Sequence, residues 1–142
     1  MDLGPLSGVI KPALVILVLV AVVLIVSNKT SNALHAQLGK NPLFLSKNDS
    51  TMMQVLVTNP ENTAVNNVVV SLNAPGSTHL SLYPAKQTIQ TLGPQEVRKL
   101  DFLISPIDST SAPFLPGSYR VDITTQIAGK NYSTSVFVNV EK

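Results

Sequence analysis

The 142-residue chain contains no cysteine and no tryptophan. Without cysteine it can form no disulfide, no thiolate metal site and no cysteine nucleophile. Blue-copper centres are excluded for the same reason, because they require a cysteine ligand. The absence does not decide the compartment, since proteins outside the cytoplasm also fold without disulfides.

Charge and aromatic residues are also scarce. Only 13% of residues are charged, the net charge is +2, and aromatic residues make up 5% of the chain. Lysines and arginines form no run and are not interleaved with aromatic residues, so we expect no nucleic-acid partner. The chain is nevertheless 44% hydrophobic, which is too apolar for a disordered protein.

The sequence motifs of common enzymes are missing as well. The chain has no G-x-S-x-G nucleophile elbow and no glycine-rich phosphate loop. Its two histidines, His35 and His79, are far apart in the sequence, and the carboxylates fall mostly in expected turns or on outward strand positions. We therefore expect no catalytic residue, no metal site, no cofactor and no small-molecule substrate, and hence no enzyme.

One feature that is present stands out: the aliphatic run ALVILVLVAVVLIV at Ala13–Val26. As a helix it is about 21 Å long, whereas a bilayer core of about 30 Å needs roughly 20 residues. Residues 8–12 make up the deficit if Lys11 extends its ammonium to the headgroups. The sequence predicts a short tail over residues 1–12 and a transmembrane helix with its core at residues 13–27 and a span of residues 8–27.

Two other interpretations of the run remain open. It has the length of the apolar part of a cleaved signal peptide, with a weak cleavage context at residues 34–36. It is less suited to a helix of a soluble core, because it has no polar face. Orientation is close to a tie under the positive-inside rule, since Lys11 on one side is balanced by Lys29 and Lys40 on the other.

Three N-x-S/T sequons offer glycosylation sites at Asn28, Asn48 and Asn131. Such triplets are frequent by chance in a chain rich in asparagine, serine and threonine. They favour, all the same, a single-pass protein of the cell membrane with its C-terminal domain outside the cytoplasm.

Beyond the run, residues 28–42 are polar and are expected to form a stalk that ends where Gly39–Pro42 breaks any helix. From Leu43 the hydrophobic period becomes two. Apolar residues alternate with polar ones in short segments separated by turns about every ten residues. One of these turns, Ala128–Asn131, is typical of a hairpin loop. The pattern predicts about seven or eight antiparallel strands and no helix, which is an all-β sandwich over residues 43–142.

Four segments of this region resemble an immunoglobulin-like module of the CARDB and NEW3 type, which occurs in archaeal and bacterial surface proteins. They are Val57–Pro60, Asn67–Leu72, Leu92–Glu96 and Pro116–Val121. The resemblance covers roughly Leu43 to Val140 and implies binding or structural work outside the cell, with no catalytic residues. It also implies that the Tyr119 hydroxyl bonds a nearby backbone group, as in a tyrosine corner.

Two functions are compatible with these features. The first is a surface protein whose immunoglobulin-like domain binds other proteins; the second is an accessory subunit that stabilises or caps a membrane complex from outside. The partners are then the membrane and other proteins. The proline-bounded loop between Ser105 and Pro116 is the expected contact loop. Its polar residues are Asp108, Ser109, Thr110 and Ser111.

Overall fold

The computed structural model describes residues 33–107 and 115–142. Within these ranges the chain forms nine strands and one turn of 3-10 helix at Leu45–Lys47. The strands are β1 (Leu34–Leu38), β2 (Leu43–Phe44), β3 (Thr51–Thr58), β4 (Val65–Asn73), β5 (Leu80–Tyr83), β6 (Lys86–Leu92), β7 (Val97–Pro106), β8 (Gly117–Ile127) and β9 (Lys130–Glu141). None of the described residues belongs to a helix long and apolar enough to cross a membrane. The tail and the span expected at residues 8–27 lie outside the described ranges.

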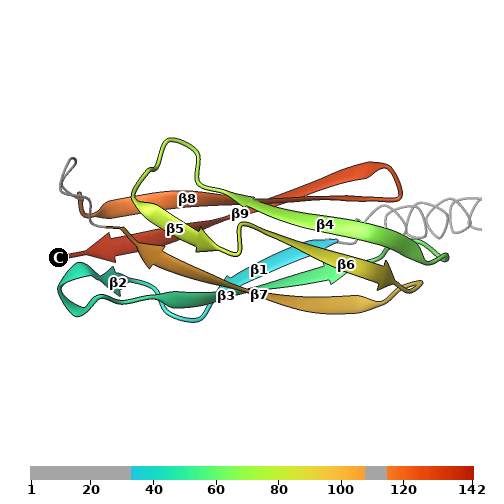
Figure 1. The fold of residues 1–142 in the computed structure, drawn as a ribbon, viewed down its shortest axis with the longest axis horizontal. Coiled ribbons are helices and arrows are strands. Elements are labelled where there is room, and N and C mark those ends of the chain that lie inside the picture. Colours follow the sequence, from blue (N-terminus) through green and yellow to red (C-terminus); the bar gives the residue numbers. More distant parts are fainter. Residues whose placement is uncertain (1–32, 108–114) are drawn as a thin grey trace, which may run out of the picture. The chain divides into compact units, whose positions relative to one another are not determined.

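The strands form two sheets that stack face to face (Figure 1). The four-stranded sheet has the order β1-β3-β7-β5, and the five-stranded sheet has the order β2-β9-β8-β4-β6. The predicted all-β sandwich is therefore confirmed. The described part of residues 43–142 forms eight strands, within the expected number, and β1 adds a ninth before them. The all-antiparallel pairing is wrong, because β2 pairs with β9 in parallel.

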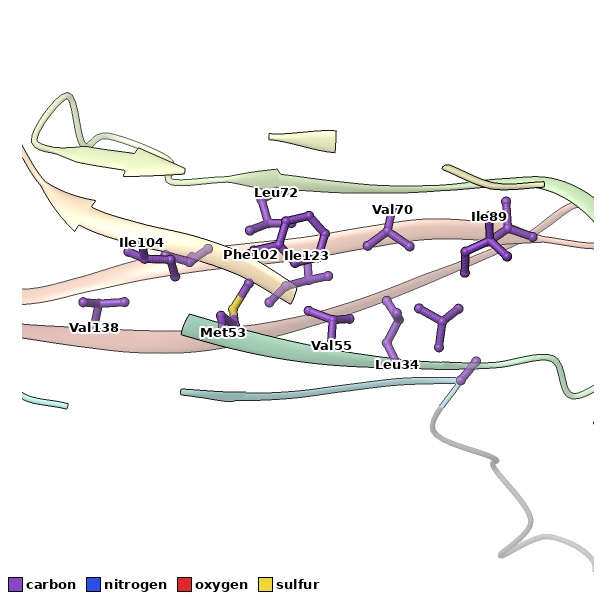
Figure 2. Close-up of a cluster of buried hydrophobic side chains, with 14 of the residues drawn as sticks. Leu34, Met53, Val55, Val70, Leu72, Ile89, Phe102, Ile104, Ile123 and Val138 are labelled. Atoms are coloured by element: carbon purple, nitrogen blue, oxygen red, sulfur yellow. The ribbon is translucent and has the colours of Figure 1, made fainter. Parts of the chain in front are cut away.

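The core lies between the two sheets and follows from the two-residue period of the strands. Along β3 the side chains of Met53, Val55 and Val57 are buried, while the intervening Met52, Gln54 and Leu56 are exposed. Phe102 and Ile123, from opposite sheets, are fully buried at the centre (Figure 2). Because successive strand side chains point to opposite faces, the same alternation places every other residue on an outer face.

The polar segment expected as a stalk over residues 28–42 contains a strand of the sandwich. Leu34–Leu38 pairs with β3, from Leu34 opposite Val57 to Leu38 opposite Met53. The boundary expected at Leu43 is therefore wrong, and the described domain already includes Ala33, which is buried. The sequence predicts a stalk here because β1 is a short strand at the sheet edge, and the polar side chains of His35 and Gln37 lie on its outer face.

After β1 the chain crosses from the four-stranded to the five-stranded sheet, which explains the parallel pair. Leu43 and Phe44 lie beside the end of β9. The Asn41 side chain extends this pairing: its Nδ2 donates to the Phe137 carbonyl at 3.0 Å, and its Oδ1 accepts from the Asn139 amide at 2.8 Å. An amide side chain thus takes the place of a backbone peptide on the β9 edge.

At the end of the sandwich where β1 begins, one buried side chain joins the two sheets. Asn59, fully buried after β3, donates from Nδ2 to the carbonyls of Thr63, Leu92 and Gly93 at 2.8, 3.1 and 2.9 Å. Its Oδ1 accepts from the Glu61 amide at 3.0 Å. Because Nδ2 carries two hydrogens, one of them is shared between two carbonyls. The amide therefore satisfies backbone groups from the β3–β4 loop and from the end of β6.

Ion pairs strengthen the same end. Lys130, at the start of β9, lies 2.9 Å from Glu61 Oε1, and this carboxylate raises the pKa of the lysine. Glu96 accepts from Arg98 Nε at 3.0 Å and from the Gly93 amide at 2.7 Å, and these two bonds lower the pKa of its carboxyl. The Lys130–Glu61 pair thus links the turn between β8 and β9 to the loop between β3 and β4, whereas the Glu96 bonds hold the turn between β6 and β7 together.

Two local expectations are confirmed. The turn predicted at residues 128–131 is a tight hairpin, with Ala128 and Gly129 at φ of 49° and 77° between β8 and β9. Positive φ at both central residues is the signature of a type I′ turn. The Tyr119 hydroxyl donates to the Leu115 carbonyl, four residues upstream, as the resemblance to a tyrosine corner implied.

Replacing Asn59 with alanine tests its role. Asn59→Ala leaves buried carbonyls without donors, so we expect the free energy of unfolding to fall by about 3 kcal/mol. The chain has three tyrosines, Tyr83, Tyr119 and Tyr132. All three lie in the sandwich, so tyrosine fluorescence during urea unfolding of the full chain reports on this domain. The matched control is Asn73→Ala at an exposed strand position, expected to change stability by less than about 0.5 kcal/mol. Equal losses in the two variants would contradict a joining role.

Candidate interaction surfaces

The outer face of the four-stranded sheet carries three exposed apolar side chains in one line across three strands. Met52 on β3 lies opposite Leu103 on β7, and Leu103 lies opposite Tyr83 on β5. Their exposed fractions are 45%, 36% and 71%, respectively. We name Met52, Leu103 and Tyr83 the apolar row. Such a continuous line differs from the single exposed apolar residues that are normal on a protein surface.

Polar groups border the apolar row. Gln54 and Asp101 face each other two residues further along β3 and β7, on the same outer face. Asp101 lies 3.7 Å from Lys99, so its charge is opposed by a neighbour, although both side chains are about half exposed. An apolar centre with a polar border is the usual anatomy of a protein-binding patch.

The outer face of the five-stranded sheet differs in character. It carries a shallow groove of about 480 Å³, which we name the polar groove. Its lining comes from β4, β8 and β9. The residues are Val69, Ser71, Thr124, Thr125, Gln126, Asn131, Tyr132 and Ser133. Hydroxyl and amide side chains dominate the lining, and no charged residue contributes to it.

At the end of the sandwich opposite Asn59, Asp49 holds the turn between β2 and β3. Its Oδ2 accepts from Lys40 Nζ at 2.6 Å and from the Phe44 amide at 2.9 Å. Both bonds favour the charged form and lower the pKa of this carboxyl, with the bond from Lys40 having the larger effect and the bond from Phe44 the smaller. Lys47 adds a cation–π contact, with its ammonium 4.6 Å from the centre of the Phe44 ring.

The residues expected to be functional are dispersed. Asn48 is exposed at the end of the 3-10 turn, in a left-handed conformation with φ of 50°. Asn131 is exposed at the start of β9 and lines the polar groove. Asn28 and the contact loop Asp108, Ser109, Thr110 and Ser111 lie outside the described residues, so their roles stay predictions.

The histidines have different surroundings. His35 is exposed on β1, whereas His79 is half-buried, with its ring edge-on to Tyr119 at a centroid distance of 6.5 Å. Over residues 33–107 and 115–142, no three histidine or carboxylate side chains gather in a way that could hold a metal ion. The expectation of no metal site stays a prediction for the whole chain.

Sequence reasoning missed both surfaces. The apolar row has a sequence signal, because Met52–Met53 and Phe102–Ile104 break the alternation with an extra apolar residue at an outward position. The polar groove has almost none, since it depends on the order β4-β8-β9 within the sheet. Period-two patterns identify strands but do not give their neighbours.

The comparisons with known proteins concern the fold. Neither a scan against protein-family models nor a search of curated proteins finds a match. Among solved structures, a FixG-related protein from Vibrio parahaemolyticus is similar with a TM-score of 0.55 and 15% identity, over 77% of this chain and 95% of that one. A transglutaminase from red sea bream is similar with a TM-score of 0.52 and 16% identity, over 77% of this chain but 15% of that one.

A CARDB domain from Pyrococcus furiosus is similar with a TM-score of 0.47 and 19% identity, over 76% of this chain and 94% of that domain. At such low identities a likeness shows the fold alone. What the comparisons establish is a β-sandwich whose architecture recurs in proteins with different activities, and fold by itself does not assign function.

The depressed pKa of Asp49 predicts a particular acid response. A carboxyl with a folded pKa below its unfolded value contributes stability above the unfolded pKa and loses it as pH falls through the folded pKa. The stability gap between the wild type and Asp49→Asn is therefore expected to be constant above about pH 5 and to narrow below about pH 3.9. Thermal unfolding between pH 7 and pH 2, followed by tyrosine fluorescence, measures the gap. Glu96 is present in both proteins, so its contribution to the pH dependence of stability cancels in the gap. A gap independent of pH would contradict the assignment.

Proposed function

We propose that this chain is a non-enzymatic, single-pass membrane protein that presents its β-sandwich outside the cytoplasm for binding to other proteins. The observation that carries the proposal is the apolar row on the outer face of the four-stranded sheet. Covering these exposed side chains with a partner removes apolar surface from water, which lowers the free energy of the complex. Leu103, at the centre of the row, is the expected anchor.

The tether in this proposal is the aliphatic run Ala13–Val26. Only residues 27–33 separate it from β1, so a membrane-spanning run would hold the sandwich on a link of at most about 24 Å. The position of β1 also bears on the signal-peptide interpretation. Cleavage after Ala36 would remove the first three of the five residues of β1 and expose the edge of β3. This cost favours a retained anchor over cleavage at that position.

The position at which the chain enters the sandwich decides which of its surfaces a partner can reach. Ala33 accepts a hydrogen bond from the Thr58 amide at 2.8 Å, so the chain enters beside Asn59. A tether attached there leaves the outer faces of both sheets, and the opposite end with the Asp49 turn, available to partners. Pro106 and Gly117, which flank the expected contact loop, belong to strand ends at that opposite end.

Photo-crosslinking in native membranes tests the proposal. A benzophenone amino acid replaces Leu103 in one variant and Thr88, exposed on β6 of the other sheet, in the matched control. We expect one discrete protein adduct from position 103 and none from position 88. Mass spectrometry of the adduct separates the two functions, since a cell-surface protein supports the first and a subunit of a multi-subunit membrane complex supports the accessory role. No adduct from position 103 would contradict both.

The affinity for the crosslinked partner measures how much the apolar row contributes to binding. Leu103→Lys places a charge in the apolar row and is expected to weaken binding by about 2 kcal/mol, or roughly 30-fold, as for a central hot spot. Gln54→Lys, on the same face of the sheet, is the matched control and is expected to bind nearly as the wild type does. Similar losses in both variants would show that general charge, and not the row, governs binding.

A further inference from the structure

The polar groove lies where three neighbouring strands of the five-stranded sheet present small polar side chains in register. Ser71 on β4 lies opposite Thr124 on β8, which lies opposite Ser133 on β9. Beside this line, Gln126 lies opposite Asn131. The groove volume of about 480 Å³ falls in the range of small-ligand sites, about 300 to 1,000 Å³.

The lining indicates the chemistry of what would fit. Thr125 already donates its hydroxyl to the Val69 carbonyl at 2.8 Å. Over the described residues, the hydroxyls of Ser71, Thr124 and Ser133 have no protein partner and are available to a ligand. Val69, 41% exposed, adds an apolar surface. Neutral donors and acceptors around a small apolar surface suit a sugar, whose rings have hydroxyl edges and apolar faces.

The sequence places an attachment point for a sugar at one corner of this groove. Asn131 and Ser133 are the first and third residues of the triplet Asn131-Tyr132-Ser133, and both line the groove. Such a triplet is an acceptor for N-linked glycans. We propose that Asn131 is glycosylated and that the polar groove seats the first sugars of its own glycan against β4 and β8. This inference rests on the proposed placement of the sandwich outside the cytoplasm.

The covalent step needs a donor of the lipid-diphosphate-linked oligosaccharide class. A bond forms between Asn131 Nδ2 and the anomeric carbon of the donor sugar, and the bond from that carbon to the diphosphate oxygen breaks. The lipid diphosphate leaves with the bonding electron pair, and the amide gives up one proton. No oxidant or reductant takes part. Attachment keeps the sugar beside the groove at a high effective concentration, so weak contacts are enough to seat it.

The chain supplies an internal control for the test. Asn48 is a second sequon on an exposed turn and does not line the polar groove. The full chain is translated in the presence of rough microsomes, which supply both donor and transferase, and peptide mass spectrometry measures occupancy at each site. A peptide amidase that removes N-glycans is then applied to the native and the unfolded chain. We expect cleavage at Asn131 to be about tenfold slower in the native chain, and equally fast in both states at Asn48.

Variants that keep the triplet intact locate the cause of the protection. Thr124→Val and Ser71→Ala remove groove hydroxyls and are expected to raise native cleavage at Asn131 towards the unfolded rate. Ser135→Ala, exposed on β9 but outside the groove, is the matched control and should keep the protection.

The outcomes that overturn the proposal are distinct from one another. A glycan at Asn48 with Asn131 unmodified refutes the inference and leaves the proposed function standing. An Asn131 glycan that is cleaved equally fast in the native and unfolded chains shows that the groove does not seat it. No glycan at either site refutes the placement outside the cytoplasm, and with it this inference.

Discussion

The described structure depends on the amide of Asn59, which satisfies backbone groups at the end of the sandwich where the chain enters. A buried backbone carbonyl without a donor is costly, and this side chain donates to three of them. They belong to a loop that leaves the four-stranded sheet and to the end of a strand in the five-stranded one. Gln95, at the adjoining turn, adds a bond from its Nε2 to the Pro60 carbonyl at 2.9 Å. These local polar bonds join the two sheets at this end, and the bond from Gln87 Nε2 on β6 to the Asp101 carbonyl on β7, at 2.6 Å, adds a further link between them.

This fixed end bears on the proposed function, because it decides how the sandwich would be presented to a partner. Because β1 enters beside Asn59 and belongs to the sandwich, a tether preceding β1 would be attached to a rigid body. The two outer faces then carry different chemistry. The apolar row suits a protein partner, whereas the polar groove suits a sugar. The alternation of buried and exposed positions along each strand produces both faces, since it decides which side chains leave the core.

The fold class was predictable from the sequence because alternation of apolar and polar residues is a local property. Met53 to Val57 and Val136 to Val140 show it plainly. The hairpin at Ala128 and Gly129 was predictable from its turn residues. β1 was not, because it is short, only Leu34 of its five residues is buried, and His35 and Gln37 make it look like a linker. The parallel β2–β9 pair and the polar groove depend on which strands become neighbours. That information is non-local, so no single segment contains it.

The central claim is that a membrane-held sandwich faces the outside of the cell. The absence of native cysteine allows one thiol to report on it, placed by Ser135→Cys at an exposed position of β9. Intact cells are treated with a membrane-impermeant maleimide, and the membrane fraction is then washed at alkaline pH. The account predicts full labelling without permeabilisation, on a protein that stays in the membrane fraction. Labelling only after permeabilisation, or release of the labelled protein by the wash, would contradict it.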